Sequence, residues 1–364
     1  MELTTIWFVV IAGLWIGYFV LEGFDFGVGI LLRVLGRDEP ERRAVITTIG
    51  PVWDGNEVWL IVAGAMTFAA FPEWYATLFS TFYLPLFAIL VALILRGVAI
   101  EYRGKRDDLA WRSRMDTLIT IGSLLPSLLW GIAFANLVRG VPLDASHEFT
   151  GSLATLLNPF ALLGGVAFTA LFVAHGAIFL ALRTTDDLRH RANRLASITG
   201  VAAAVLVATF LTWAQVLRGT TASAVVAALA ALALLASLAA NKPLRRPSEA
   251  KGSGAAVPTH PTPPREGWAF AGTALAIALG VASLFVAMFP AVMPSTLDPA
   301  WSLTVTNAAS SAYTLKILTV IAAIFTPLVM LYQGWTYWVF RKRVTVEPVT
   351  VQLLTPPHHP GQAS

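Results

Sequence analysis

The chain contains no cysteine and few charged residues. Without Cys it has no disulfide, no thiolate-bound metal and no iron–sulfur cluster. Charged residues make up 13% of its 364 residues, against about 25% in an ordinary soluble domain, while 56% of the residues are hydrophobic. The net charge of +4 arises from 25 Lys and Arg against 21 Asp and Glu, which is too small for a nucleic-acid-binding surface. These shortages exclude a soluble globular enzyme, a disordered chain and a nucleic-acid binder.

Long apolar runs account for most of the sequence. A membrane-spanning helix needs roughly 20 mostly apolar residues. Because lipid offers the backbone no hydrogen-bond partners, such runs are expected to be helices. We therefore predict an all-α polytopic membrane protein with nine transmembrane helices. They cover roughly residues 6–32, 47–70, 74–100, 117–138, 158–182, 195–217, 221–240, 268–289 and 313–340.

Basic residues are concentrated on one side of the expected helices. All but three of the 25 Lys and Arg fall on that side, and the exceptions are Arg139, Arg218 and Lys316. The count includes Arg96, which stands near the end of the third expected helix. Because positively charged loops stay in the cytoplasm, the N-terminus is expected outside the cell and the C-terminus in the cytoplasm.

Loop composition suggests how the helices are grouped. Residues 1–140 are expected to form a first four-helix bundle with buried acids, and residues 141–241 contain helices five to seven. Residues 242–267 are rich in Pro, Gly and Ser and are expected to be a flexible cytoplasmic linker. Residues 268–340 contain the last two helices, and residues 341–364 form a cytoplasmic tail. The expected architecture is two four-helix bundles and one additional helix.

Four acidic residues fall inside expected helices, where a charge is costly and usually functional. Glu22 and Asp25 are three residues apart, as are Asp54 and Glu57, so each pair shares one helix face. At 1.5 Å per residue, Asp25 lies about 12 Å and Asp54 about 16 Å from the same arginine-rich membrane edge. We predict that these buried carboxyls meet between antiparallel helices and form a proton path that opens to the cytoplasm. A structural role is the alternative for each acid. Asp54, for example, can cap a helix that Gly50-Pro51 breaks just before it.

Glycines and one histidine are the other unusual features of the expected helices. Gly13 and Gly17 form one pair at a spacing of four, and Gly23 and Gly27 form another, which permits close packing within the chain or with a partner. His175 is the only histidine in an expected helix. One such histidine cannot hold a bis-histidine haem, so we expect no metal or haem to be ligated by this chain. His175 is interpreted as a hydrogen-bonded or water-facing residue whose role is open.

Two N-terminal motifs together resemble subunit II of cytochrome bd-type quinol oxidases. The resemblance covers nearly the whole chain and is weakest around 242–267. The matching segments are Glu22-Gly23-Phe24-Asp25-Phe26-Gly27-Val28-Gly29, Trp53-Asp54-Gly55-Asn56-Glu57-Val58-Trp59, Leu157-Asn158-Pro159-Phe160 and Met288-Phe289-Pro290-Ala291-Val292-Met293-Pro294-Ser295.

The resemblance implies a haem-free subunit of a complex in the bacterial plasma membrane. That complex oxidises quinol, reduces oxygen to water and takes protons from the cytoplasm. Haems b558, b595 and d are expected in the partner, subunit I. Subunit II is needed for assembly, and some members of the family hold a structural quinone. A small accessory subunit is a further expected partner.

The resemblance also implies roles for particular residues. The acid at the position of Asp54 contributes to a proton channel, and the tryptophan at the position of Trp59 borders an oxygen route. Where relatives carry Gln, this chain has His175. Neither the resemblance nor the sequence distinguishes ubiquinol from menaquinol.

A proton-coupled secondary transporter is the alternative function, because buried acids and interrupted helices also mark transporter substrate sites. A purely structural scaffold is a third hypothesis, in which every buried acid is dispensable.

Overall fold

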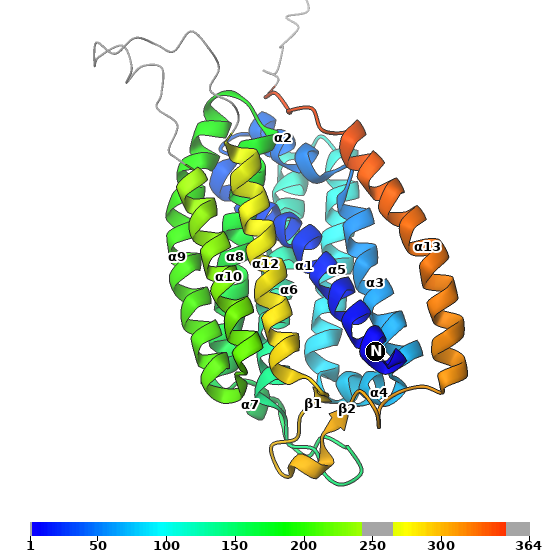
Figure 1. The fold of residues 1–364 in the computed structure, drawn as a ribbon. Coiled ribbons are helices and arrows are strands. Elements are labelled where there is room, and N and C mark those ends of the chain that lie inside the picture. Colours follow the sequence, from blue (N-terminus) through cyan, green and yellow to red (C-terminus); the bar gives the residue numbers. More distant parts are fainter. Residues whose placement is uncertain (1, 242–264, 347–364) are drawn as a thin grey trace, which may run out of the picture.

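The computed structural model describes residues 2–241 and 265–346 as a bundle of long helices that run side by side (Figure 1). Most of the expected linker, most of the tail and the pair His358–His359 lie outside the described residues. The helices are α1 (Leu3–Leu35), α2 (Glu39–Ile49), α3 (Trp53–Ala70), α4 (Pro72–Thr81), α5 (Tyr83–Tyr102), α6 (Leu109–Arg139), α7 (Leu153–Leu156), α8 (Pro159–Arg183), α9 (Asp186–Arg218), α10 (Thr221–Ala240), α12 (Glu266–Met288) and α13 (Ala312–Val339).

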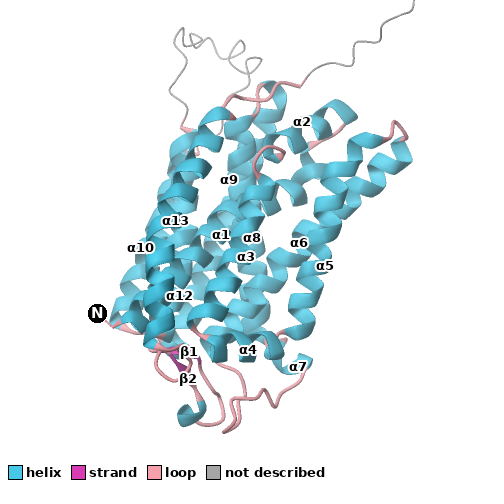
Figure 2. Ribbon diagram, turned by 90° about the vertical axis from the view of Figure 1, so that its right-hand side faces the viewer, coloured by secondary structure: helices cyan, strands magenta, loops and turns pink. Residues whose placement is uncertain are grey.

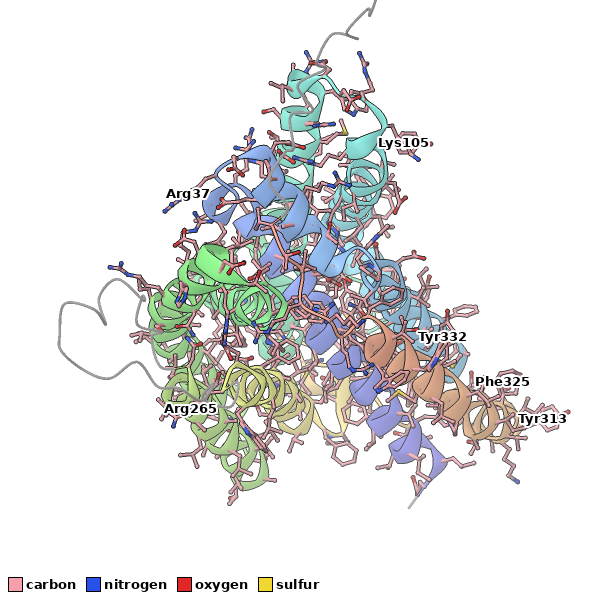
Figure 3. All side chains as sticks on the ribbon, turned by 90° about the horizontal axis from the view of Figure 1, so that it is seen from above. Arg37, Lys105, Arg265, Tyr313, Phe325 and Tyr332 are labelled. Carbon is pink, nitrogen blue, oxygen red and sulfur yellow. The ribbon has the colours of Figure 1, made fainter. Side chains whose placement is uncertain are left out.

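The two ends of the bundle differ in composition. α2 lies at one end of the bundle (Figure 1), together with Arg37, Lys105 and Arg265 (Figure 3), and we call this the basic end. The start of α1, α4, α7 and the strands β1 (Ala291–Met293) and β2 (Leu303–Thr304) lie at the opposite end (Figure 2). There, hydrogen bonds between Val141 and the segment Pro294–Thr296 join the two long connections into one ordered cap.

Eight helices of the described chain are long and apolar enough to cross a membrane: α1, α5, α6, α8, α9, α10, α12 and α13. The prediction of one continuous helix over 47–70 is wrong. That segment is divided around Gly50-Pro51 into α2 and the 18-residue α3. α3 is not among the eight, because Asp54, Asn56 and Glu57 make its first turns polar. The expected helix over 74–100 is also divided, at Phe82, into the short α4 and the long α5.

α1 lies at the centre of the bundle and packs against α3, α6, α8 and α12. Its two glycine pairs allow two of these approaches, those of α3 and α8. A Cβ at Gly27 would collide with the backbone of α8 at Phe172 and Gly176, and a Cβ at Gly23 would collide with the Phe172 ring. A Cβ at Gly17 would collide with the Trp59 indole of α3, whereas a Cβ at Gly13 would meet nothing within 4 Å. Three of the four glycines therefore face helices of the same chain, and Gly13 faces outward.

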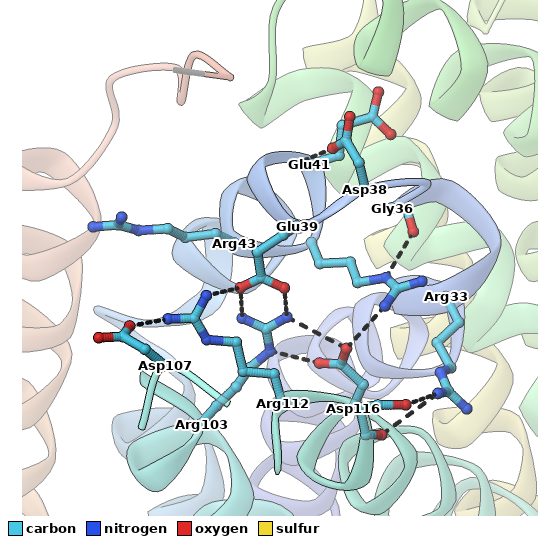
Figure 4. A network of polar contacts seen from close by, with 12 residues as sticks. Arg33, Gly36, Asp38, Glu39, Glu41, Arg43, Arg103, Asp107, Arg112 and Asp116 are labelled. Atoms are coloured by element: carbon cyan, nitrogen blue, oxygen red, sulfur yellow. Dashed lines mark hydrogen bonds and ion pairs between the residues drawn. The ribbon is translucent and has the colours of Figure 1, made fainter. Parts of the chain in front are cut away.

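A network of ion pairs fastens α2 across the basic end (Figure 4). Arg103, which follows α5, donates two hydrogen bonds to Glu39 of α2, at 2.9 and 2.8 Å. The same guanidinium lies 2.5 Å from the carboxylate of Asp116, a fully buried residue of α6. Arg42 reaches Asp116 from the other side at 3.5 Å, and Arg112 pairs with Glu39 at 3.2 Å. These ion pairs therefore join α2 to α5 and α6, and each charged group named here contacts a group of the opposite charge.

α13 stands at the edge of the bundle, and Leu315 is its only buried residue. Two contacts hold it at the opposite end. The Trp7 indole donates to the Leu315 carbonyl at 3.2 Å and to Thr319 at 3.0 Å. Ser310, just before the helix, bonds through its backbone N–H to the Ala70 carbonyl at 2.9 Å.

A short strap after α13 anchors it at the basic end. Arg343 donates to the carbonyls of Ala181 and Thr184, at 2.9 and 2.8 Å, and so caps the C-terminus of α8. The Val344 N–H bonds to the Arg183 carbonyl at 2.7 Å. Burial lowers the pKa of the Arg343 guanidinium, which nevertheless stays charged at physiological pH.

Substituting Gly27 and Gly13 by alanine separates packing from helix propensity. Both sites lie inside α1, so the gain in propensity is the same, but only Gly27→Ala forces α1 and α8 apart. We expect Gly27→Ala to lower the free energy of unfolding by about 1–3 kcal/mol relative to Gly13→Ala. Thermal unfolding of the detergent-purified protein measures the difference. Equal stability of the two variants would show that the contact between α1 and α8 is not tight.

Candidate functional site

An ion pair lies in the interior of the bundle, within the membrane-spanning helices. Glu22 of α1 and Arg96 of α5 are 0% and 1% exposed, and their carboxylate and guanidinium are in direct contact. The guanidinium also lies over the Phe26 ring, 4.9 Å from its centroid. Gly122 of α6 makes room for this arrangement, because a Cβ there would collide with the Cβ of Arg96. α1, α5 and α6 therefore enclose a charge pair that neither lipid nor water reaches in the chain as described.

Arg96, expected with the basic residues at one membrane edge, is instead buried within the bundle. Arg96 lies within α5, seven residues before Arg103, which belongs to the separate ion network at the basic end. The signal was in the sequence: Arg96 interrupts a run of apolar residues and is followed by Val98, Ala99 and Ile100. An arginine one turn from the end of a span can reach the surface or turn inward, and composition does not distinguish the two.

Asp25 is the second fully buried acid, and it is linked to two other helices through Asn56. The Asn56 amide nitrogen of α3 donates to Asp25 Oδ2 at 2.7 Å. The Asn56 carbonyl oxygen accepts from Gln333 Nε2 at 3.0 Å and from the Tyr337 hydroxyl at 2.7 Å, both on α13. Sequence reasoning missed Asn56, Gln333 and Tyr337, because uncharged polar residues are common in membrane helices and carry no signal on their own.

The other two predicted acids lie nearer the surface of the chain. Glu57 is partly buried. The prediction that Asp54 is buried within the chain is wrong, because its side chain is exposed in the first turn of α3. A carboxylate is favourable there because of the helix dipole. Trp59, one turn further, is partly buried with its ring against Gly17.

His175 of α8 is fully buried, and both of its ring nitrogens are engaged. Nδ1 lies 2.6 Å from the Thr273 hydroxyl of α12, and Nε2 lies 3.2 Å from the Val20 carbonyl of α1. The ring stacks on Phe270 with centroids 4.5 Å apart. An axial haem ligand needs a free nitrogen and open space in front of it, so His175 does not fit that role. It links three helices.

The described residues offer groups that can carry protons. Two carboxylates, Glu22 and Asp25, lie one turn apart on α1 beside one cation, Arg96, and a third acid, Glu57, lies on the neighbouring α3. Carboxyl groups are side chains that can accept and release protons. Within residues 2–241 and 265–346, no group of three or more His, Asp or Glu is arranged to hold a metal ion.

Comparisons with known proteins point to one family. The model of cytochrome bd terminal oxidase subunit II matches residues 3–340. Cytochrome bd ubiquinol oxidase subunit 2 of Bacillus subtilis (strain 168) is 41% identical over 352 residues, which is 96% of this chain and 99% of the relative. Cytochrome bd-I ubiquinol oxidase subunit 2 of Escherichia coli (strain K12) is 35% identical over 370 residues, 94% and 96% of the two chains. A bd oxidase structure from Geobacillus thermodenitrificans has the same fold, with a TM-score of 0.68 at 16% identity. The superposition covers 94% of this chain and 100% of the chain in that structure.

The ion pair between Glu22 and Arg96 predicts a specific pattern of stability. Arg96→Met leaves the Glu22 carboxylate buried without a partner, and we expect a loss of about 3–5 kcal/mol in the free energy of unfolding. The double variant Glu22→Leu/Arg96→Met removes both charges and is expected to be more stable than Arg96→Met alone. Thermal unfolding of the purified protein tests this order. A double variant less stable than Arg96→Met would contradict a buried charge pair.

Proposed function

Because the chain belongs to the family of cytochrome bd terminal oxidase subunit II, we propose that it is the haem-free subunit of a bacterial oxidase that couples quinol oxidation to the reduction of oxygen to water. As a member of this family it is a multi-pass membrane protein and part of an oxidoreductase of the respiratory chain. The match over residues 3–340, which includes the acidic cluster of Glu22, Asp25 and Glu57, is the observation that carries the proposal.

In this proposal the haems b558, b595 and d and the quinol-oxidising site belong to the partner, subunit I. The engaged ring nitrogens of His175 support that division, because this buried histidine already links helices of the chain. The chain's own contributions are assembly of the complex and handling of protons. A structural quinone, lipid and a small accessory subunit complete the proposed partners.

The proposed membrane topology counts α3 as a ninth crossing element. α3 runs beside α1 and α13, and its ends lie near the two ends of the bundle (Figure 1). With nine crossings, the N-terminus and the described C-terminal strap lie at opposite ends of the bundle. The positive-inside rule then places the basic end in the cytoplasm and the N-terminus outside. α1, α3, α5 and α6 form the first proposed group of four helices, α8, α9, α10 and α12 form the second, and α13 is the additional helix.

The proposed proton path runs from the cytoplasmic side to the acidic cluster. Reduction of oxygen to water consumes protons, which must cross part of the membrane to reach the haem-bearing partner. Asp25 and Glu22 provide buried carboxyls for that transfer, and Arg96 balances their charge within the bundle. The exposed side chain of Asp54 supports a role at the surface of α3, where a partner subunit can complete the path. In this proposal Glu57, one turn further along α3, connects Asp54 with the buried Asp25 and Glu22.

Trp59 has a proposed role beside an oxygen route. Its partly buried indole packs against Gly17 of α1, and Val58 and Ile61 expose an apolar surface elsewhere on α3. An apolar surface of this kind suits a neutral, apolar gas better than it suits ions or water.

Membership of the family does not favour the proton-coupled transporter. Capture of the chain from solubilised membranes separates the two functions. We expect it to bring down a haem-containing membrane protein and quinol-supported oxygen consumption. A stable chain that carries no haem-containing partner and moves a solute into vesicles would contradict the oxidase proposal.

Neutralising the acids tests the proton path. Asp25→Asn and Asp54→Asn keep the shape of the side chain but remove the group that gains and loses a proton. We expect each to slow quinol-driven oxygen consumption by roughly 10-fold, less than the roughly 100-fold cost of losing a catalytic acid or base. The oxygen electrode measures the rate, normalised to haem content. Glu73→Gln, at an exposed acid of α4 at the opposite end, is the matched control. Full activity of both aspartate variants would favour the scaffold hypothesis.

A further inference from the structure

α13 has little apolar contact with the bundle but donates two hydrogen bonds into its interior. Leu315 is the only buried residue of the helix, and Tyr313 and Tyr332 are 75% and 66% exposed. From the basic end, Tyr313, Phe325 and Tyr332 lie at the periphery of the molecule (Figure 3). Gln333 and Tyr337 are four residues apart, so they share a helix face, and both side chains reach Asn56.

These two donors determine which way the Asn56 amide points. A carbonyl oxygen has two lone pairs, and in Asn56 both accept a hydrogen bond, one from Gln333 and one from Tyr337. The amide NH₂ group must therefore face Asp25, where it donates to Oδ2 at 2.7 Å. If the amide were rotated, its NH₂ group would face the Gln333 donor and its oxygen would face a carboxylate. Without α13, only the hydrogen bond to Asp25 itself would hold the amide in this orientation.

The two oxygens of Asp25 consequently differ. Oδ2 accepts the Asn56 hydrogen bond, whereas Oδ1 is buried and accepts none from the described chain. The charged groups that act on this carboxylate are Glu22 of α1, Glu57 of α3 and Arg96 of α5. Oδ1 is therefore the oxygen open to a proton, while Oδ2 is fixed in position by the amide.

We propose that Gln333 and Tyr337 are positioning residues for proton transfer at Asp25: through the Asn56 amide they hold Oδ2, so that Oδ1 alone exchanges the proton. The proposal rests on the proposed function, because it assigns a place in the proton path to α13. The proposal gives α13, the weakly packed outer helix, a part in proton transfer. It also gives Asn56 a role in orienting Asp25. The proton is bound and released at Oδ1, and no bond to Asn56, Gln333 or Tyr337 is broken in that step.

Tyr337→Phe tests the proposal, with Tyr332→Phe as a matched control. Both variants remove one hydroxyl from the same helix, but the Tyr332 side chain is 66% exposed, whereas the Tyr337 hydroxyl bonds to Asn56. In the assembled complex we expect Tyr337→Phe to slow quinol-driven oxygen consumption about 3- to 10-fold, the effect of one lost hydrogen bond. Tyr332→Phe is expected to match the wild type. Gln333→Met, which keeps side-chain length but removes the donor, gives a second measurement at the same amide.

An infrared signature distinguishes positioning from general destabilisation. In redox difference spectra of the complex, the Asp25 carboxyl band is identified by its loss in Asp25→Asn. Tyr337→Phe and Gln333→Met are expected to shift that band, because the hydrogen bond to the carboxyl changes, and Tyr332→Phe is expected to leave it in place. In an Asn56→Leu background, Tyr337→Phe should have no further effect on rate, since the two residues act through one path.

The outcomes separate this inference from the proposed function. If Asp25→Asn is impaired while Tyr337→Phe and Gln333→Met match Tyr332→Phe in rate and spectrum, the inference is overturned and the proton path stands. If Tyr337→Phe slows the enzyme equally in the Asn56→Leu background, it does not act through the amide, and the inference fails. If Asp25→Asn itself has full activity, Asp25 carries no proton and the inference fails; the proposed path fails with it only if Asp54→Asn is fully active as well.

Discussion

A buried guanidinium needs a counter-charge, and that requirement organises the centre of this protein. Arg96 is 1% exposed and can remain in the bundle only because the Glu22 carboxylate is in contact with it. The pair fixes the distance between α1 and α5, and Gly122 of α6 leaves the space that the arginine backbone needs. Asp25, one turn along α1, lies in the same electrostatic environment. The acidic cluster is therefore part of the structural core as well as the candidate proton site.

The sequence predicted the elements that depend on local composition. The acids at Glu22 and Asp25 lie on one face of α1 because a spacing of three defines a helix face. The weakness of the chain at Gly50-Pro51 was visible in the residues themselves, and the helix is interrupted there. The family follows from motifs in the first 60 residues, and the comparison over residues 3–340 confirms it.

What could not be predicted depends on how each helix is rotated about its axis. Periodicity places Asp54 and Glu57 on one face of α3 but does not say which neighbour that face meets, and Asp54 is exposed. Arg96 occupies a position near the end of its span from which a long side chain can turn either way. The division at Phe82 has no Gly or Pro at the break itself, since Pro85 comes three residues later, within α5. The two donors to the Asn56 carbonyl oxygen come from about 280 residues away, a contact that no local pattern encodes.

The way α13 is anchored bears on how the protein fits a bilayer. Its 28 residues correspond to about 42 Å of helix, more than the roughly 30 Å of hydrocarbon in a typical membrane. A free helix would adapt to a thinner membrane by tilting alone. α13 is tied to Trp7 near one end and to the C-terminus of α8 through Arg343 at the other, so it cannot tilt independently. Adjustment to lipid thickness must therefore be shared by the whole bundle or met by deformation of the surrounding lipid.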